Sequence, residues 1–293
     1  MADTPAIPQA IKRIDKVTYS REGNVNRAVE HDVVVTEQPL QINLLWHNAD
    51  LITESKVFAI TMRSVGDEVC LILGLLFSEG VIKHPSDIAS IYVENSSEAQ
   101  NTNSWQVQFS KGIAPNLTSI ERFQATYSSC GLCGATSLKA LELKAPVNLL
   151  NSTQGLQIDV DLIYTLTVKM RTQQQLFNQT GGTHSAALFN QTAQLLAIYE
   201  DIGRHNAVDK LIGKGLKQKT LPVHNQLLVM FVSGRVSFEI VQKAVMAGIS
   251  ILVAVGAPSD LAIKAAQRFE LTLIGFLKDD SFNLYHGDWR IKA

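Results

Sequence analysis

The sequence predicts an α/β protein in which a smaller N-terminal α+β domain precedes a larger C-terminal α/β domain with three layers. The length of 293 residues and the 46% share of hydrophobic residues are enough for one large or two modest cores. The first third is rich in alternating, β-branched segments, a pattern typical of strands. From about residue 159, apolar strands without alternation take turns with amphipathic helices. That second pattern indicates a sheet covered by helices on both faces.

The N-terminal part is expected to contain strands and one helix. Residues 1–15 have the character of a flexible leader, and residues 16–45 alternate and carry β-branched side chains, which predicts strands. The apolar run 69–77 predicts a helix, and Gly80 after it suits a left-handed helix cap. Residues 88–109 predict a hairpin around a polar loop.

The C-terminal part is expected to alternate between helices and strands. Helices are predicted at residues 162–178, 207–214, 238–247 and 259–270. Strands are predicted at residues 185–189, 194–199, 226–232, 251–255 and 272–276. The chain therefore divides into a flexible leader, an N-terminal α+β domain, a mobile Cys-x-x-Cys loop with linker, and an α/β domain, at residues 1–15, 16–125, 126–144 and 145–293.

Charge and composition exclude several classes of protein. A net charge of -1 provides no basic excess for general nucleic-acid binding. No apolar stretch reaches the roughly 18 to 20 residues that span a bilayer, and the first residues lack the apolar core of a signal peptide. We therefore expect a cytoplasmic protein without membrane attachment. In that reducing compartment, three cysteines do not indicate a disulfide scaffold.

The segment Cys130-Gly-Leu-Cys133-Gly134 is the strongest chemical signal in the chain. It holds two of the three cysteines, on a backbone that glycines leave accessible. Cys-x-x-Cys spacing tends to lower the pKa of one thiol, and the thiolate is the attacking species in sulfur chemistry. The hydroxyls of Ser128 and Ser129 could donate hydrogen bonds to such an anion.

On the residues alone, sulfur handling, a metal site and an inert turn remain open for this pair. A structural zinc site usually needs four ligands, and no second Cys-x-x-Cys or helical His pair supplies the other two. A thioredoxin-like redox pair is typical of an early βαβ unit, whereas this pair lies near mid-chain. The third cysteine, Cys70, lies in an apolar run and is interpreted as a core residue.

Polar clusters lie at the ends of the strands predicted for the C-terminal domain. Ligands bind beyond the carboxyl ends of such strands, so these side chains are candidates for binding. A guanidinium and free N–H groups near a helix start would suit a phosphate. Tight turns, helix caps and ion pairs are the alternative explanation. The candidates are Thr183, His184, Arg204, His205, Ser233 and Arg235.

Taken in order, motifs along most of the chain resemble the formate dehydrogenase accessory sulfurtransferase family (FdhD). A lone Cys-x-x-Cys is a weak signal, whereas this ordered set is highly specific. The motifs are Met62-Arg63-Ser-Val-Gly-Asp67-Glu68, Glu79-Gly80-Val-Ile, Ser128-Ser-Cys130-Gly-Leu-Cys133-Gly134, Thr180-Gly-Gly-Thr-His184, Glu200-Asp-Ile-Gly-Arg-His-Asn-Ala-Val-Asp-Lys210, Ser233-Gly-Arg235 and residues 276–285.

The resemblance implies a sulfurtransferase that formate dehydrogenase needs for activity. Such a protein accepts sulfur from a cysteine desulfurase as a persulfide and passes it to the molybdenum cofactor. Cys130 matches the persulfide-carrying position, and Cys133 is a second thiol that could relay sulfur. Dimerisation is common in the family, so the partners implied are the desulfurase, formate dehydrogenase and a second copy of the chain.

The implied cofactor is molybdenum bis(molybdopterin guanine dinucleotide), which the family binds as a client. The segment that matches the family's binding segment is Phe276, Leu277, Lys278, Asp279, Asp280 and Ser281. Two positions depart from the family pattern. Ala135 stands where a lysine commonly follows Cys-x-x-Cys-Gly, and two acids stand in a segment that usually reads Phe-x-Arg-Gly-x-Arg.

The resemblance also implies a cytidine-deaminase-like C-terminal domain without zinc. In zinc deaminases, His-x-Glu and Pro-Cys-x-x-Cys open two successive helices. Here His205-Asn-Ala207 and Ser233-Gly-Arg-Val236 stand at the comparable places, without the glutamate and both cysteines. The alternative function is a chaperone that binds the molybdenum cofactor without transferring sulfur.

Overall fold

The computed structural model describes residues 10–19, 28–48, 50–94, 103–116, 118, 121, 149, 153, 155–222 and 226–293. The two cysteines expected to carry the chemistry, Cys130 and Cys133, lie outside these residues, as does the expected loop and linker 126–144.

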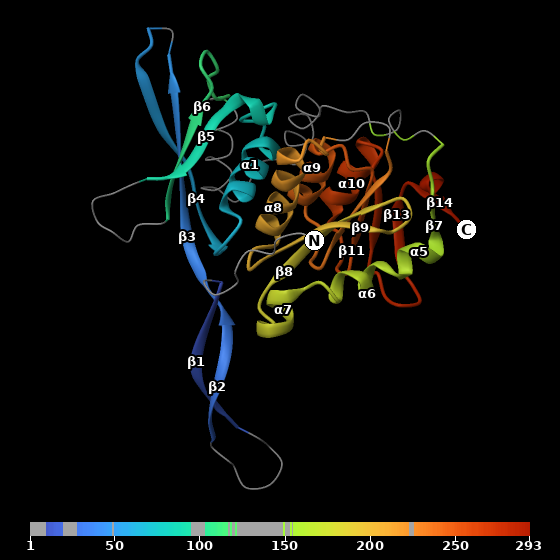
Figure 1. Ribbon diagram of the computed structural model, residues 1–293. Coiled ribbons are helices and arrows are strands. Elements are labelled where there is room, and N and C mark those ends of the chain that lie inside the picture. Colours follow the sequence, from blue (N-terminus) through green and yellow to red (C-terminus); the bar gives the residue numbers. More distant parts are fainter. Residues whose placement is uncertain are drawn as a thin grey trace.

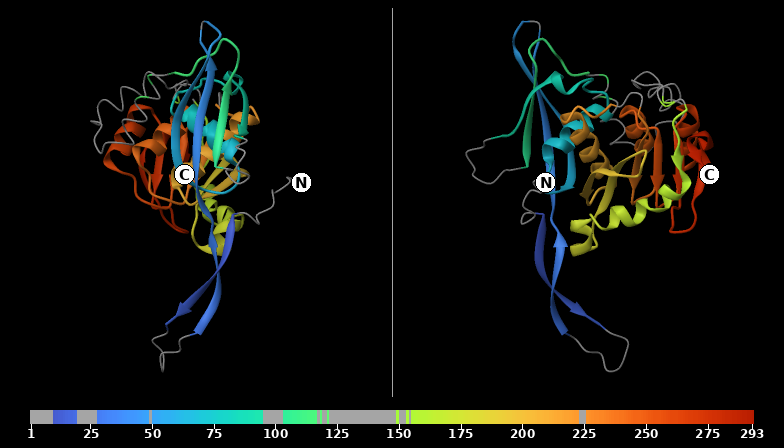
Figure 2. Two further views of the ribbon diagram at one scale, coloured as in Figure 1. Left: turned by 90° about the vertical axis from the view of Figure 1, so that its left-hand side faces the viewer. Right: turned by 45° about the vertical axis from the view of Figure 1, so that its right-hand side comes forward.

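A two-stranded antiparallel ribbon, which we call the arm, extends away from the rest of the molecule (Figures 1 and 2). It consists of β1 (Ile11–Thr18) and β2 (Ala28–Val35), and most side chains of β1 are exposed. Residues 11–15 were expected in a leader, but they belong to β1. Their cross-strand partners on β2, from Val35 to His31, complete a ladder that the local sequence of the leader does not reveal.

A four-stranded sheet follows the arm, in the order β4-β3-β6-β5. Its strands are β3 (Glu37–His47), β4 (Thr53–Ser64), β5 (Ile88–Val93) and β6 (Ser104–Phe109). The predicted hairpin is confirmed, because β5 and β6 pair antiparallel. The predicted helix is confirmed as α1 (Glu68–Ser78), and Gly80 after it adopts a φ of +68°. A short 3-10 helix, η2 (Pro85–Asp87), precedes β5.

The central sheet of the C-terminal part has six strands in the order β13-β12-β11-β10-β8-β9. They are β8 (His184–Asn190), β9 (Leu195–Asp201), β10 (Leu228–Val232), β11 (Ile251–Ala254), β12 (Thr272–Gly275) and β13 (Asn283–His286). β10, β11 and β12 run parallel, whereas β8 and β13 run antiparallel to their neighbours. The five strands predicted here correspond to β8 through β12.

Helices pack on both faces of this sheet, so the mixed α/β class expected from the sequence is confirmed (Figure 1). Leu188 and Met230 face one core, shared with α1, α8 (Arg204–Lys217), α9 (Phe238–Met246) and α10 (Asp260–Arg268). Their sequence neighbours Phe189 and Val229 point to the opposite face and pack in the other core, with α5 (Val160–Tyr164) and α6 (Leu166–Arg171). The remaining elements are α7 (Gln175–Thr180), β7 (Ile158–Asp159), η3 (Asp288–Arg290) and β14 (Ile291–Lys292).

The single helix predicted over residues 162–178 is instead three short helices, α5, α6 and α7. Two threonines lie at the breaks. The hydroxyl of Thr165 donates to the carbonyl of Leu162 at 2.7 Å, and that of Thr172 donates to Lys169 at 3.0 Å. Side-chain bonds of this kind compete with the helical hydrogen-bond ladder, which explains the interruptions.

Helices α1 and α8 cross at two glycines. A Cβ at Gly74 would overlap the backbone carbonyl of Asp209, and one at Gly213 would overlap that of Cys70. Cys70 is buried, as expected. Because α1 belongs to the N-terminal part, the hydrophobic core is continuous across the boundary expected between the two domains. None of the helices in the described part of the chain is long and apolar enough to cross a membrane.

Candidate functional site

Four strands of the central sheet end at one edge, which brings the predicted binding residues together. β9, β10, β11 and β12 run the same way, and β8 begins at this edge because it runs opposite to β10. We call it the carboxyl edge; it comprises residues 183–184, 201–206, 233–237, 255–258 and 276–283. Every candidate from 183 to 281 lies there, as the sheet topology predicts.

His184 and Arg204 lie against Gly234. A Cβ at Gly234 would be 3.4 Å from both Nδ1 of His184 and Cδ of Arg204, so the glycine leaves room for the two side chains. Burial, and then the charge of Arg204, lowers the pKa of His184. His184 is therefore a neutral imidazole at neutral pH.

His205 is the second residue of α8, and it faces the start of α9. Its Nε2 lies 3.2 Å from the hydroxyl oxygen of Ser237, the N-cap residue of α9. Burial lowers the pKa of His205 to about 4, and the charges of Lys243 and Arg204 add to the shift. A neutral imidazole in this position can donate or accept a hydrogen bond with the hydroxyl of Ser237. Protonation of His205 would add a positive charge next to Lys243 and Arg204, and this is disfavoured.

Thr183 and Ser233 use their hydroxyls to hold the edge itself. The hydroxyl of Thr183 donates to Oε1 of Glu200 at 3.0 Å, and Glu200 also accepts from the first N–H groups of α7. The hydroxyl oxygen of Ser233 accepts the N–H of Ser185 at 2.9 Å. These bonds fix the backbone next to His184 and Arg235, the neighbouring candidates for ligand binding.

Two arginines of the carboxyl edge, Arg204 and Arg235, are available to a ligand. Arg235 is exposed, and Nε of Arg204 is buried with no hydrogen-bond partner. Across the described residues, no carboxylate forms an ion pair with Arg204 or Arg235. Guanidinium groups without a carboxylate partner suit an anionic ligand, because each can donate hydrogen bonds to phosphate oxygens.

Residues 276–281 form an exposed turn beyond β12. Phe276 has a φ of +55°, in the left-handed region, and the residue is 41% exposed. Leu277 is buried and donates its N–H to the carbonyl of Ala254, and the Lys278 N–H donates to the Ser281 carbonyl at 2.8 Å. Lys278, Asp279, Asp280 and Ser281 are all exposed. The turn thus offers backbone groups, one cation and two carboxylates.

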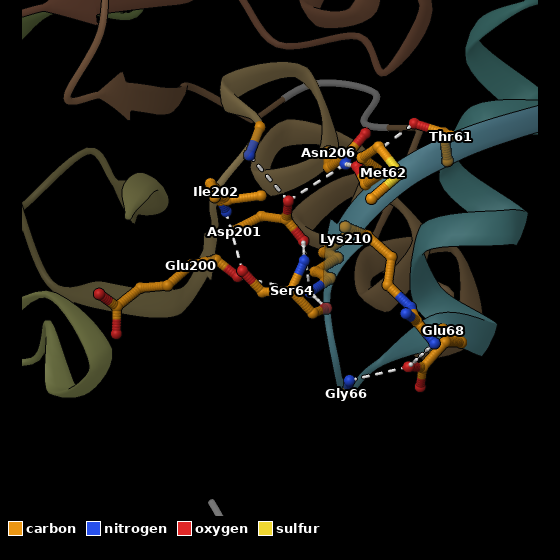
Figure 3. Close-up of polar contacts among 12 residues, drawn as sticks. Thr61, Met62, Ser64, Gly66, Glu68, Glu200, Asp201, Ile202, Asn206 and Lys210 are labelled. Atoms are coloured by element: carbon orange, nitrogen blue, oxygen red, sulfur yellow. Dashed lines mark hydrogen bonds and ion pairs between the residues drawn. The ribbon is translucent and has the colours of Figure 1, made fainter. Parts of the chain in front are cut away.

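Beneath the edge lies a buried polar group formed by Ser64, Asp201, Asn206 and Lys210, which we call the Asp201 network (Figure 3). Asp201 is fully buried, and its carboxylate lies 2.8 Å from Nζ of Lys210, which is also buried. Nζ of Lys210 donates to the carbonyl of Ser64 at 3.1 Å. The network therefore joins the end of β4 to the turn between β9 and α8.

A second buried ion pair lies on the N-terminal side of this network. The guanidinium of Arg63 lies 3.1 Å from Oε1 of Glu68, which also accepts the N–H of Gly66 at 2.8 Å. The motifs around residues 62–68 and 200–210 thus meet in space, although they are far apart in sequence.

Sequence reasoning did not select Ser64 or Asp201 as site residues. The available signal was that both motifs contributed to the family resemblance, but nothing in the sequence shows that they touch. Among the described residues, no group of three or more His, Cys, Asp or Glu side chains could hold a metal ion.

Comparison with known proteins gives a consistent result. A model of the FdhD/NarQ family matches residues 35–292. A relative from Streptomyces avermitilis, named sulfur carrier protein FdhD, is 41% identical over 280 residues, 94% of each chain. A relative of the same name from Sulfurisphaera tokodaii is 37% identical over 273 residues, covering 93% of this chain and 97% of the relative.

One solved structure is similar over nearly the whole chain. It is the crystal structure of a “putative formate dehydrogenase accessory protein” from Desulfotalea psychrophila, with a TM-score of 0.68 and 22% sequence identity. The match covers 97% of this chain and all of that one. The two chains share their fold.

Proposed function

The chain belongs to the FdhD/NarQ family, and from this premise we propose that it is a sulfur carrier required for formate dehydrogenase activity. One observation carries the proposal. Relatives named sulfur carrier protein FdhD are 37–41% identical over more than nine-tenths of the chain. The chain also holds the cysteine pair that such chemistry needs, Cys130 and Cys133.

In the proposed reaction, the thiolate of Cys130 attacks the outer sulfur of a persulfide on a cysteine desulfurase. A new S–S bond forms on Cys130, the donor's S–S bond breaks, and the donor cysteine leaves as a thiolate. The exchange needs no external oxidant or reductant. Cys133 is the second thiol of the motif and relays the sulfur. We place the reaction in the cytoplasm. The protein acts as a monomer or as a homodimer.

The recipient of the sulfur is the molybdenum cofactor, molybdenum bis(molybdopterin guanine dinucleotide), bound as cargo before its insertion into formate dehydrogenase. The carboxyl edge supports this assignment, because Arg204, Arg235 and Lys278 are cations near backbone N–H groups. Asp279 and Asp280 oppose an anion, so contacts at residues 276–281 run through the backbone.

The finer proposal for the fold is a cytidine-deaminase-like C-terminal domain that has lost its zinc chemistry. Two features support it. His205 lies in the first turn of α8 after β9, and Ser237 is the N-cap residue of α9 after β10. At these places the chain has no glutamate two residues after the histidine and no cysteine pair.

The experiment is intact-protein mass spectrometry after incubation with a cysteine desulfurase and cysteine. Wild type should gain the mass of one sulfur atom, reductant should reverse the gain, and Cys130→Ala should abolish it. Cys70→Ala is the matched control and should gain the sulfur normally, because Cys70 is buried and burial raises the pKa of its thiol. No gain in wild type with an active donor would overturn the proposal.

A second candidate function is a chaperone that carries the molybdenum cofactor without transferring sulfur. The cations of the carboxyl edge favour it, since they bind an anion whether or not a thiol reacts. Under this alternative, Cys130→Ala would keep its cofactor affinity and still activate formate dehydrogenase. Under the leading proposal, the variant would bind the cofactor and leave the enzyme inactive.

A further inference from the structure

The Asp201 network lies directly under the turn that carries Arg204 and His205. We infer that Asp201 and Lys210 are positioning residues, which hold Arg204 and His205 in place for the anionic cargo. This inference rests on the proposed function, because it concerns binding at the same edge.

One oxygen of Asp201 holds the turn at both of its ends. Oδ1 accepts the N–H of Gly203 at 2.8 Å and the side-chain amide of Asn206 at 3.1 Å. Arg204 and His205 are the two residues between these anchors, and they begin α8. Their side chains therefore leave the backbone from a segment fixed at each end.

The other oxygen ties the same turn to the N-terminal sheet. Oδ2 lies 2.8 Å from Nζ of Lys210 and accepts the N–H of Ser64 at 3.1 Å. The hydroxyl oxygen of Ser64 in turn accepts the N–H of Ile202 at 2.9 Å, and the amide of Asn206 donates to the carbonyl of Met62 at 2.7 Å (Figure 3). The end of β4 thus supports the turn from below.

The carboxylate of Asp201 is surrounded by hydrogen-bond donors, which need an acceptor on both of its oxygens. All four groups facing the carboxylate are donors: the N–H groups of Ser64 and Gly203, the amide of Asn206 and the ammonium of Lys210. Asparagine at this position would turn an NH2 group toward one pair of these donors, whichever way it is flipped. The isosteric change Asp201→Asn therefore removes one of the two sets of bonds while keeping the side-chain volume.

The molecule contains a matched control, the buried pair Asp209–Lys243. Nζ of Lys243 lies 2.7 Å from Oδ1 of Asp209, and the hydroxyl of Ser78 donates to the same oxygen at 3.2 Å. This pair joins α8 to α9 and α1, and the carboxylate of Asp209 accepts from the side chains of Ser78 and Lys243, which lie outside the turn 202–205. Asp209→Asn therefore perturbs an equally buried ion pair without releasing the turn.

The first test uses GDP as the probe, with the full chain and isothermal titration calorimetry. Asp201→Asn should weaken GDP binding about tenfold or more relative to wild type, while Asp209→Asn keeps the wild-type affinity. Equal affinities in wild type and Asp201→Asn, or equal losses in both variants, would overturn the inference. Failure of wild type itself to bind GDP would instead overturn the cargo chemistry of the proposed function.

The second test needs no ligand and reports on the turn directly. The pKa of His205 is lowered to about 4 by burial and by Lys243, Arg204 and His184, against an opposing effect of Glu239. In an NMR titration, Asp201→Asn should raise that pKa toward 6.5, because the released turn lets water reach the imidazole. Asp209→Asn should not raise it, since Lys243 keeps its charge. An unchanged His205 titration in Asp201→Asn would contradict positioning.

Should Asp201→Asn fail to fold, Asn206→Ala gives the same test in a milder form. It removes the amide that links Asp201 to the carbonyl of Met62 but leaves the ion pair with Lys210 intact. GDP affinity should again fall and the pKa of His205 rise. A variant that folds and matches wild type in both measurements would overturn the inference.

Discussion

Two buried Asp–Lys pairs meet on helix α8, and they differ in what surrounds the carboxylate rather than in the ion pair itself. The pair Asp201–Lys210 has an N–O distance of 2.8 Å, and Asp209–Lys243 has one of 2.7 Å. Asp201 also accepts two backbone N–H groups, one from Gly203 at the turn and one from Ser64 at the end of β4. Asp209, in the described part of the chain, instead accepts from side chains on α1 and α9. The same kind of ion pair can thus fix the turn between β9 and α8 or join three helices.

The largest effect is expected from breaking the pair that joins the helices. Asp209→Ala leaves the ammonium of Lys243 without its nearest carboxylate, so the free energy of unfolding should fall by about 3–5 kcal/mol at pH 8. Urea denaturation measures this loss. The double change Asp209→Leu with Lys243→Met should restore most of it, because no buried charge remains. A single variant as stable as wild type would contradict the assigned packing role.

The next effect tests the helix crossing that adjoins Asp209. A methyl group in Gly74→Ala would overlap the backbone carbonyl of Asp209, so α1 and α8 must separate. We expect a loss of about 3 kcal/mol in unfolding free energy, at the upper end for overpacked cores. The thermal midpoint should drop, while the GDP affinity of the remaining folded protein is unchanged. A wild-type thermal midpoint in Gly74→Ala would show that α1 and α8 can separate at this crossing at little cost, which contradicts the prediction.

A smaller effect is expected from a methyl group at the turn between β9 and α8. In Gly203→Ala, the Cβ would lie 3.0 Å from Nδ2 of Asn206 and 3.4 Å from Oδ1 of Asp201. Asn206 can shift by a few tenths of an ångström, so we expect a stability loss of only about 1 kcal/mol. GDP affinity should fall all the same, which reverses the pattern expected for Gly74→Ala. A variant that loses stability but not affinity would remove the distinction between the two pairs.

The smallest effect is a pair of opposite pH dependences. His205 has a pKa lowered to about 4 from 6.5, so the folded state binds fewer protons and loses stability as pH falls through this interval. Burial raises the pKa of Asp209 from 3.8 to about 6, so its contribution instead loses stability as pH rises.

Thermal midpoints measured between pH 4 and 6.5 should separate these two contributions. His205→Asn should make stability fall more steeply, or rise less, with increasing pH. Asp209→Asn should change the slope in the opposite direction. Identical slopes in the two variants would refute the assigned environments.

Much of the fold could be predicted, because burial pattern and element type are local properties. The helices α8, α9 and α10 and the strands from β8 to β12 follow the predicted segments. The failures also have local causes. The threonines at 165 and 172 divide a continuous apolar pattern, and residues 11–15 are strand only because β2 returns beside them.

The residues of the carboxyl edge could be predicted from the sequence, whereas the Asp201 network beneath it could not. Parallel strands place their carboxyl ends together, so Arg204 and Ser233 could be grouped from the sequence. His184 joins them because β8 runs antiparallel to β10 and begins at this edge. The contact between Ser64 and Asp201 joins positions 137 residues apart, and no periodicity reports such a contact. Burial of Lys210 was equally hidden, since lysine is almost always exposed.

The arm has a consequence for the exchange of its amide hydrogens with solvent. Across the described residues, β1 and β2 pair with each other and with no third strand, and α7 contacts β2. Two-stranded ribbons of this kind are marginally stable in water. The arm should therefore open without unfolding the body, and its amides should take up deuterium long before those of the central sheet. A component of the sulfur route that slows this uptake would identify itself as the arm's binding partner.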